Sequence, residues 1–325
     1  MGGESISVII PVLNEAPALP ELIQRTEATL SRLSRPYEII LIDDGSNDGT
    51  PAVLRELAAD YPRLHAVRFR RNYGKAAALS VGFARARGDF LITLDGDLQD
   101  APEEIPRLLD KLISEFDVVC GWKKKRQDRW TRVLGSRLFN AGTRLLTGLK
   151  LHDMNCGLKG YRRQVVQELR LYGEMHRFIP VIARQRGFTV GEIPVEHSPR
   201  RFGRSRYGWS RPLSGLFDLI TLLMLGRYTY KPLHFFGLFG LGCEAVGALI
   251  TLNLAIGWLQ GHWISNRPLF LIGIFFLLSG IQFIIFGLLA ELFIYSHARD
   301  GDYGIAEVVE NVTHGSDVAV VRQIR

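Results

Sequence analysis

The chain has 325 residues, a formal net charge of +7 at pH 7 and three cysteines, Cys120, Cys156 and Cys243. An odd number of widely spaced cysteines excludes a disulfide framework and gives no zinc-binding pattern, which suits a reducing compartment. The length is sufficient for one α/β domain of about 200 residues and a further part. The basic charge is compatible with nucleic acid, anionic lipid or phosphate-bearing ligands as partners.

The first part of the chain alternates apolar strand patterns with helical patterns. Strands are predicted over residues 5–11, 37–42, 64–69, 90–94 and 117–120, and helices over 19–33, 51–59, 75–87 and 102–116. Thr50 is the expected N-cap of the second helix. Regular alternation of this kind predicts a parallel sheet with helices on both faces.

Polar residues follow four of the predicted strands, at Asn14-Glu15, Asp43-Asp44, 72–75 and 95–99. Ligands of such sheets bind at the carboxyl ends of the strands, so these side chains are expected to converge on one edge. One such group taken alone would be interpreted as a solvated acidic turn, because turns favour Asp and Gly. The repetition after several strands favours a binding site instead.

A divalent cation site is predicted at the end of strand 90–94. Asp95 and Asp97 flank a single glycine, so both carboxylates can face one cation, and Gln99 continues the alternation. Oxygen ligands of this kind suit Mg²⁺ or Mn²⁺, which bind few carboxylates and leave room for substrate phosphates.

The sequence becomes strongly basic after Cys120. One basic segment spans 121–129, and a second follows a predicted strand at 188–195 and occupies 200–207. The first segment is open to three interpretations that do not exclude one another: attraction to lipid headgroups, binding of an acceptor phosphate, or a surface without a specific ligand. Amphipathic helices are predicted over 130–149 and 209–228, and the second fits the surface of a membrane.

Two segments, 235–259 and 269–295, are each apolar and long enough to cross a bilayer, which needs about 20 residues. A short turn joins them, so both ends of the chain are expected on one side of the membrane. The segments flanking the pair hold Arg227, Lys231, His297 and Arg299, whereas Arg267 is the only Lys or Arg in the turn. This asymmetry predicts that both ends are cytoplasmic. A membrane-embedded chain is a poor fit to nucleic-acid binding.

The two spans carry further features. Gly273, Gly280 and Gly287 recur every seven residues and predict a smooth stripe for close helix packing. Glu244 lies inside the first span, where an ionisable residue is a functional candidate. Glu244 and Gln282 are equally far from the predicted turn. We therefore expect them at similar depth, either hydrogen-bonded to each other or packed at a contact between subunits.

Together these motifs resemble family 2 glycosyltransferases of the GT-A fold, in the branch that moves a sugar from a nucleotide to a polyprenyl phosphate. Dolichol-phosphate mannose synthase and the bacterial undecaprenyl-phosphate sugar transferases are the closest types. The resemblance extends from about Ile6 to the end of the second span and is carried by 10–15, 43–46, 71–75, 95–100 and the turn at Asp153.

The resemblance implies an α/β, Rossmann-like, mainly parallel sheet flanked by helices, followed by a two-helix transmembrane hairpin. The expected parts are a cytosolic GT-A domain at 1–208, juxtamembrane amphipathic helices at 209–230, two transmembrane helices within 231–297, and a cytosolic tail at 298–325. A homo-oligomer is also implied, with a tetramer among its forms.

The resemblance also implies roles for individual residues. Positions that hold the nucleotide-sugar match Pro11, Asn14, Glu15, Asp43, Asp44, Lys75 and Asp95. The metal-binding positions match Asp95, Asp97 and Gln99, and the acceptor-phosphate positions match Lys123, Arg137, Arg201, Ser205 and Tyr207. Catalytic roles fall to Asp97, Asp153 and Arg201. Lys75 follows a glycine at a predicted helix start, where a donor phosphate could lie, or it is a solvated helix lysine.

The activity implied is an inverting, metal-dependent transfer of a sugar from a nucleotide-sugar to a polyprenyl phosphate at the cytoplasmic (inner) membrane. A UDP-sugar is favoured as donor, with GDP-mannose as the alternative. The product would serve the glycosylation of a cell-envelope glycan, lipid A or protein. Two other functions remain open: a membrane glycosyltransferase with a non-polyprenyl acceptor such as a diglyceride, and a catalytically silent membrane scaffold.

Overall fold

A computed structural model describes residues 4–124, 148–149, 151–169, 171, 173, 175–199, 231–261 and 268–297. The chain divides into two compact units, residues 1–219 with 307–325, and residues 220–306. The predicted helix at 209–228, most of the one at 130–149, the boundaries at 208 and 230 and the tail at 298–325 lie outside the described residues. The division of the chain into domains therefore stays a prediction.

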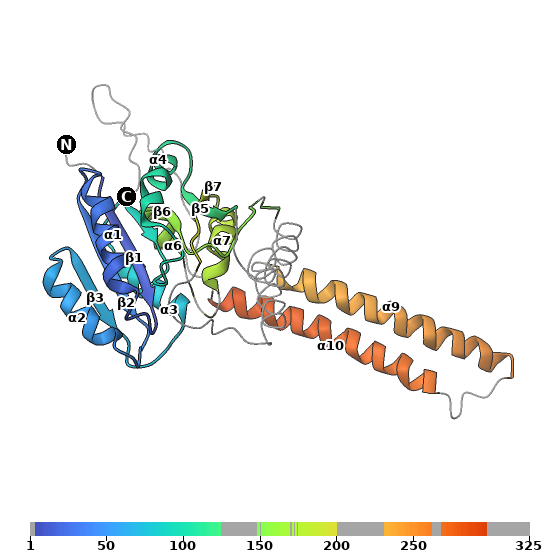
Figure 1. Ribbon diagram of the computed structural model, residues 1–325. Helices are drawn as coiled ribbons and strands as arrows, with labels where there is room; N and C mark the ends of the chain where they lie inside the picture. The colour runs from blue at the N-terminus through green and yellow to red at the C-terminus, as the bar shows by residue number, and fades with distance from the viewer. Residues whose placement is uncertain are drawn as a thin grey trace, which may run out of the picture. The chain divides into compact units, whose positions relative to one another are not determined.

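The first unit is built on a seven-stranded sheet in the order β3-β2-β1-β4-β6-β5-β7 (Figure 1). The strands are β1 (Ile6–Val12), β2 (Tyr37–Asp43), β3 (Leu64–Arg68), β4 (Phe90–Thr93), β5 (Val118–Lys123), β6 (Lys159–Arg162) and β7 (Val190–Val195). Only β6 runs antiparallel to its neighbours among these strands. The prediction of a mainly parallel sheet is confirmed.

The order of the strands reverses at β1. The chain moves outward from β1 to β2 and β3, and then returns past β1 to β4. The loops after β1 and β4 therefore leave the sheet side by side, which is where open α/β sheets bind their ligands. The antiparallel strand β6 begins at this same edge, because Lys159 pairs with Thr93 at the end of β4.

Helices cover both faces of the sheet (Figure 1). They are α1 (Leu19–Ser31), α2 (Thr50–Asp60), α3 (Lys75–Arg85), η1 (Pro102–Glu104), α4 (Ile105–Ser114), α6 (Arg163–Glu168), η2 (Met175–Phe178) and α7 (Ile179–Gln185). The helices α1, α2 and α4 share one apolar cluster with Val8 and Ile10 of β1. On the opposite face α3 lies so close that a Cβ added at Gly82 would be 2.4 Å from Cγ2 of Ile9.

The predicted N-cap of α2 is wrong by one residue. Gly49 is the N-cap, and Thr50 is the first helical residue. The Thr50 hydroxyl instead accepts a hydrogen bond from the backbone N–H of Glu15 at 3.1 Å. This contact ties the loop after β1 to the start of α2, and the backbone N–H of Thr50 donates to Asp48 Oδ1 at 2.9 Å.

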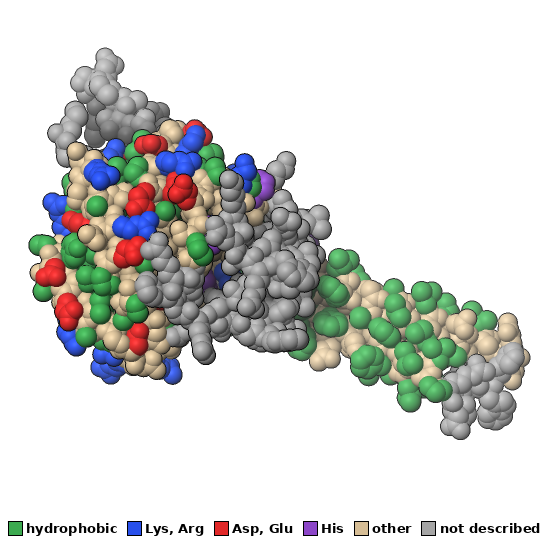
Figure 2. Space-filling view, viewed as in Figure 1, with side chains coloured by type: hydrophobic (Ala, Val, Ile, Leu, Met, Phe, Trp, Pro, Cys, Tyr) green, Lys and Arg blue, Asp and Glu red, His purple; other side chains and the backbone are tan. Residues whose placement is uncertain are grey.

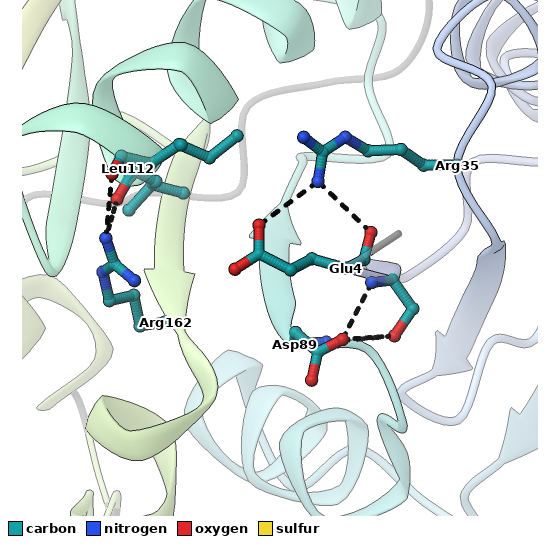
Figure 3. Close-up of polar contacts among 7 residues, drawn as sticks. Glu4, Arg35, Asp89, Leu112 and Arg162 are labelled. Atoms are coloured by element: carbon teal, nitrogen blue, oxygen red, sulfur yellow. Dashed lines mark hydrogen bonds and ion pairs between the residues drawn. The ribbon is translucent and has the colours of Figure 1, made fainter. Parts of the chain in front are cut away.

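The amino-terminal edge of the sheet is closed by polar side-chain contacts (Figure 3). The backbone N–H and the hydroxyl of Ser5 donate to Oδ2 of Asp89 at 2.8 and 2.9 Å. The guanidinium of Arg35 lies 3.3 Å from Oε2 of Glu4. The Ser5–Asp89 contacts fix the starts of β1 and β4 relative to each other, and the Arg35–Glu4 pair ties the start of β1 to the segment before β2. The candidate site occupies the opposite edge.

The second unit contains two long apolar helices, α9 (Pro232–Leu259) and α10 (Pro268–His297). Both are long and apolar enough to cross a membrane, with mean hydropathies of 1.8 and 2.6 over their most apolar windows. Hydrophobic side chains cover the visible surface of this pair, whereas charged side chains of both signs are spread over the first unit (Figure 2). The two helices therefore indicate a membrane protein, as the sequence predicts.

The glycine stripe of α10 packs against α9. A Cβ added at Gly280 would lie 2.8 Å from the carbonyl oxygen of Gly240, and one added at Gly247 would lie 2.9 Å from that of Gly273. Small residues on both helices thus bring the two backbones close together. The glycine stripe is therefore used for packing within the hairpin, as the sequence predicts for close helix packing, and the homo-oligomer stays a prediction.

The predicted hydrogen bond between Glu244 and Gln282 is absent from the part of the chain that the structure describes. Glu244 packs on Gly280, because a Cβ added there would be 2.7 Å from Cγ of Glu244. Gln282 lies two residues after Gly280, and two residues correspond to about 200° of rotation around a helix. Gln282 is therefore on the opposite face of α10, where it is exposed. Equal depth in the two spans does not bring Glu244 and Gln282 together, because their side chains occupy helix faces that do not meet. A role for Glu244 at a subunit contact stays a prediction.

We expect Gly280→Leu to weaken the packing of α9 on α10. The added side chain would meet Glu244 and the backbone of Gly240, and overpacking of this kind destabilises by about 1–3 kcal/mol. The matched control is Gly242→Leu, because a Cβ at Gly242 meets nothing within 4 Å. The thermal midpoint of the full chain in detergent should fall for the first variant and not for the second. Equal midpoints would contradict this packing.

Candidate active site

The loops after β1, β2 and β4 meet at the carboxyl edge of the sheet, as predicted. The backbone N–H of Asp44 donates to the carbonyl of Val12 at 2.9 Å, and that of Leu94 donates to the carbonyl of Ile9 at 3.1 Å. A Cβ added at Gly96 would lie 2.9 Å from Cγ1 of Val12. The Asp95–Asp97 loop therefore passes directly over the end of β1.

Asn14 holds the first two of these loops together. Its backbone N–H donates to the hydroxyl of Ser46, and its side-chain amide exchanges two hydrogen bonds with Asn47, all at 2.9 Å. The backbone of Asn14 has a φ of +56°, in the left-handed region that Asn tolerates better than most residues. Its predicted contact with the nucleotide-sugar stays a prediction beside this structural role.

The two predicted nucleotide carboxylates after β2 already have protein partners. Asp43 is fully buried, with Oδ2 lying 3.3 Å from Nε of Arg68. Asp44 accepts hydrogen bonds from the backbone N–H groups of Tyr73 and Gly74 at 2.7 and 2.9 Å. Burial raises the pKa of Asp44, and these two hydrogen bonds oppose the rise. Asp44 therefore links the loop after β2 to the start of α3.

Pro11 and Glu15 lie on either side of the bend that leaves β1. Pro11 pairs in register with Ile42 of β2, at a position one residue before Val12 ends the strand. The carbonyl of Glu15 accepts a hydrogen bond from the backbone N–H of Ala18 at 2.9 Å, and the Glu15 side chain is largely buried. Both residues are thus at the sheet edge where the nucleotide is predicted to lie.

Lys75 and Asp95 form an ion pair at the centre of this edge, with Nζ 2.5 Å from Oδ1. Burial alone would raise the pKa of Asp95, but the ammonium groups of Lys75 and Lys123 and the Lys75 hydrogen bond lower it to about 2. Asp95 is therefore ionised throughout the physiological pH range. Lys75 is the first residue of α3, and its pairing with Asp95 excludes the interpretation as a merely solvated helix lysine.

The Asp95–Gln99 segment offers a suitable set of ligands for a divalent cation. Asp97 Oδ1 accepts the backbone N–H of Gln99 at 3.2 Å, and Leu98 between them has a φ of +58°. Among the described residues no group of three His, Cys, Asp or Glu side chains is assembled as a metal site. Two carboxylates and one amide at an accessible strand end fit Mg²⁺ or Mn²⁺, because these ions keep positions for phosphate oxygens and water.

The turn that carries Asp153 is anchored at its start by Glu192 of β7. The backbone N–H of His152 donates to Oε2 of Glu192 at 2.8 Å, and the His152 ring stacks on Trp122 with 4.2 Å between ring centroids. Asp153 itself is buried, and one of its oxygens accepts the backbone N–H of Asn155 at 3.1 Å. The predicted catalytic carboxylate is therefore held in a fixed turn.

The same turn ends against Asp95, a contact that no pattern in the sequence indicates. Thr93 donates its hydroxyl hydrogen to the carbonyl of Gly157 at 2.8 Å. A Cβ added at Gly157 would lie 2.3–2.5 Å from three atoms of the Asp95 carboxyl group. Only glycine permits this approach. The structure thus brings the Asp153 turn and the predicted metal-binding loop into contact.

Lys123, predicted to contact the acceptor phosphate, lies in a buried ion pair. Its Nζ is 2.8 Å from Oδ1 of Asp100, which is fully buried, and Nδ1 of His197 is 4.0 Å from the same oxygen. Burial alone would lower the pKa of Lys123, but the Asp100 carboxylate raises it above its ordinary value. Lys123 therefore has an internal partner, and its contact with the acceptor stays a prediction.

We expect Lys123→Met to reduce the free energy of unfolding by about 3–5 kcal/mol, because it leaves the buried Asp100 carboxylate without its counter-ion. The double variant Lys123→Met/Asp100→Asn should recover most of that loss. Chemical denaturation of the full chain in detergent measures both. If Lys123→Met keeps the stability of wild type and raises only the KM for the lipid acceptor, Lys123 instead belongs to acceptor binding.

The remaining predicted acceptor residues, Arg137, Arg201, Ser205 and Tyr207, lie outside the described residues. The described end of the segment that leads to 200–207 is nevertheless attached to the predicted metal-binding loop. The backbone N–H of Ser198 donates to the carbonyl of Gln99 at 2.9 Å.

Comparison with known proteins identifies the class to which this fold and site belong. Residues 7–170 match the sequence profile of Glycosyl transferase family 2. The chain belongs to this family and is a glycosyltransferase.

Its curated relatives are polyprenyl-phosphate sugar transferases. The chain is 38% identical to the dodecaprenyl-phosphate galacturonate synthase of Rhizobium johnstonii, over 91% of this chain and 89% of the relative. It is 39% identical to the undecaprenyl-phosphate 4-deoxy-4-formamido-L-arabinose transferase of Sodalis glossinidius, over 91% of each chain. It is 40% identical to the transferase of the same name from Pseudomonas aeruginosa, over 90% of this chain and 87% of the relative.

Solved structures confirm the predicted GT-A fold. Mannosyl-3-phosphoglycerate synthase from Rubrobacter xylanophilus superposes with a TM-score of 0.54 at 19% identity, over 69% of this chain and 76% of the other. Glucosyl-3-phosphoglycerate synthase from Mycobacterium tuberculosis, crystallised with Mn²⁺, uridine diphosphate and phosphoglyceric acid, gives 0.51 at 20% identity, over 68% and 76%. Likeness at this identity concerns the fold alone.

Proposed function

We propose that this protein transfers a sugar from a nucleotide-sugar, with a UDP-sugar favoured over GDP-mannose, to the phosphate of a membrane polyprenyl phosphate. The observation that carries the proposal is the contact of the Asp95–Gln99 loop with Lys75 and Gly157 at the switch point of the sheet. The two apolar helices and the acceptors named for the relatives support a lipid acceptor.

The donor would lie across the ends of β1, β2 and β4. Pro11, Asn14, Glu15, Asp43 and Asp44 would position base and ribose, and Lys75 at the start of α3 would approach the diphosphate. Asp95, Asp97 and Gln99 would hold Mg²⁺ or Mn²⁺, which supplies positive charge to the departing diphosphate when bound.

The acceptor phosphate is already ionised near neutral pH, so it needs little help from a general base. Its oxygen attacks the anomeric carbon opposite the diphosphate, which inverts that centre and gives a β-linked product from an α-linked donor. Positioning and charge neutralisation supply most of the rate increase. Asp153 orients groups around the acceptor from its buried turn. Arg201, Arg137, Ser205 and Tyr207 belong to the proposed acceptor side.

The enzyme would work at the inner face of the cytoplasmic membrane. Basic residues flank the two spans, and Arg267 is the only Lys or Arg in the turn between them, which supports a cytoplasmic location of both chain ends. A homo-oligomer remains part of the proposal.

A donor panel tests the proposal. Full-length protein in nanodiscs with undecaprenyl phosphate is incubated with labelled UDP-glucose, UDP-galacturonate, a UDP-linked aminoarabinose derivative or GDP-mannose, with Mg²⁺, Mn²⁺ or EDTA. One UDP-sugar should be transferred to lipid, and EDTA should abolish transfer. Transfer from GDP-mannose alone would overturn the donor preference. Turnover of no donor would favour the catalytically silent scaffold.

A further inference from the structure

Asp100 directly follows Gln99, the last predicted metal ligand, and its carboxylate is fully buried. Oδ1 of Asp100 lies 2.8 Å from Nζ of Lys123, the last residue of β5. The same oxygen lies 4.0 Å from Nδ1 of His197, which follows the end of β7. The two strands are neighbours and pair in register at Lys123 and Val195. Asp100 therefore ties the chain that leaves the predicted metal-binding loop to the carboxyl ends of β5 and β7.

The backbone around Asp100 is tied to the same place. Asp100 and His197 form an antiparallel bridge, and the backbone N–H of Ser198 donates to the carbonyl of Gln99 at 2.9 Å. The backbone N–H groups of residues 196–198 thus run beside residues 99–100. The carbonyl of Gln99 and the carboxylate of Asp100 are both engaged in these contacts, so the chain has little freedom to move at this point.

The loop needs such a hold because its backbone is strained. Leu98 has a φ of +58°, in the left-handed region that residues other than Gly, Asn and Asp rarely adopt. Strained residues persist only where the surrounding structure holds them. On one side, Oδ1 of Asp97 accepts the backbone N–H of Gln99 at 3.2 Å. On the other side, the contacts of Asp100 fix the chain directly after Gln99.

We infer that Asp100 is a positioning residue of the predicted metal site and holds Gln99 beside Asp97 without itself binding the cation. It acts through the backbone of Gln99, because its own carboxylate is buried against Lys123 and His197. The inference rests on the proposed function and extends its metal site by one residue. Mg²⁺ demands near-ideal ligand geometry, and replacing a residue that orients metal ligands typically weakens metal binding by about 10- to 100-fold.

The test removes the ion pair without changing the net charge beside the predicted metal site. Lys123→Met/Asp100→Asn deletes one positive and one negative charge and leaves neither buried partner unpaired. The control is Glu104→Gln, because Glu104 is a buried carboxylate on the same segment, and Nη1 of Arg107 lies 2.5 Å from its Oε2. Mn²⁺ binding to the full chain in detergent, with saturating UDP and no acceptor, is measured by electron paramagnetic resonance. Circular dichroism and the thermal midpoint report whether each variant folds.

The double variant should bind Mn²⁺ about 10-fold more weakly than wild type, while its affinity for UDP in EDTA stays within about twofold. Glu104→Gln should bind Mn²⁺ within about twofold of wild type. Wild-type Mn²⁺ affinity in the double variant, or an equal loss in Glu104→Gln, would overturn the inference.

A second variant decides if the double variant fails to fold. Asp100→Glu keeps both charges but lengthens the tie by one methylene, so it should also weaken Mn²⁺ binding, and an unchanged affinity overturns the inference. A wild-type protein that binds no Mn²⁺ with UDP overturns the inference together with the predicted metal site. A wild-type protein that binds Mn²⁺ but transfers no sugar overturns the proposed function alone.

Discussion

Asp95→Asn is expected to lower kcat/KM by at least about 100-fold, or roughly 2.7 kcal/mol of transition-state stabilisation. The substitution removes one predicted metal ligand and leaves the Lys75 ammonium, now 2.5 Å from Asp95 Oδ1, without its carboxylate. The pKa of Asp95 is about 2, so its negative charge is present at every working pH. The loss of this charge should therefore lower kcat/KM at every pH that is measured.

The matched control for this prediction is Asp110→Asn, on the exposed face of α4. It should retain activity within about twofold of wild type, since isolated surface substitutions have small effects. Steady-state kinetics at several Mn²⁺ concentrations measure both variants. If Asp95→Asn keeps wild-type kinetics and the same dependence on Mn²⁺, Asp95 has no part in binding the metal or the donor.

Gly157→Ala is expected to cause a loss of similar size through geometry alone. The new methyl carbon would lie 2.3–2.5 Å from the Asp95 carboxyl group, far inside contact distance. Either the carboxylate rotates away from Lys75, or the turn that carries Asp153 moves. A displacement of about 1 Å at a catalytic group lowers the rate by about 100-fold, and overpacking should reduce the free energy of unfolding by about 1–3 kcal/mol.

Gly49→Ala is the control for Gly157→Ala, because its new Cβ would make an ordinary contact of 3.6 Å with Ala16. Its expected cost is limited to a weaker N-cap for α2. Activity is compared at a temperature where circular dichroism shows that both variants are folded. Near-normal turnover by Gly157→Ala would mean that the Asp153 turn leaves Asp95 when substrate binds.

The convergence of the polar loops was predictable because it follows from chain order and strand direction. The runs at β1, β2 and β4 are short, apolar and β-branched, and each is followed by Asp, Asn or Glu at the sheet edge. The two apolar helices were predictable from length and composition. For both features a local sequence pattern was sufficient for the prediction, and the structure added which side chains contact each other.

The contacts that complete the site were not predictable because they join residues far apart in the sequence. Nothing local marks Gly157 as the neighbour of Asp95, or Asp100 as the partner of Lys123. The antiparallel strand β6 has the sequence Lys-Gly-Tyr-Arg, which lacks an apolar alternation, and its pairing with β4 and β5 defines it.

The most direct test of the proposed function is the chemical identity of the lipid product. Full-length protein is given the preferred labelled UDP-sugar with equal amounts of undecaprenyl phosphate and diacylglycerol, and the product is analysed by mass spectrometry, mild-acid hydrolysis and NMR of the anomeric proton. We predict an acid-labile phosphodiester in which the sugar is attached to undecaprenyl phosphate with the anomeric configuration opposite to that of the donor. An acid-stable sugar on diacylglycerol, or a phosphodiester that keeps the anomeric configuration of the donor, would contradict the proposed function.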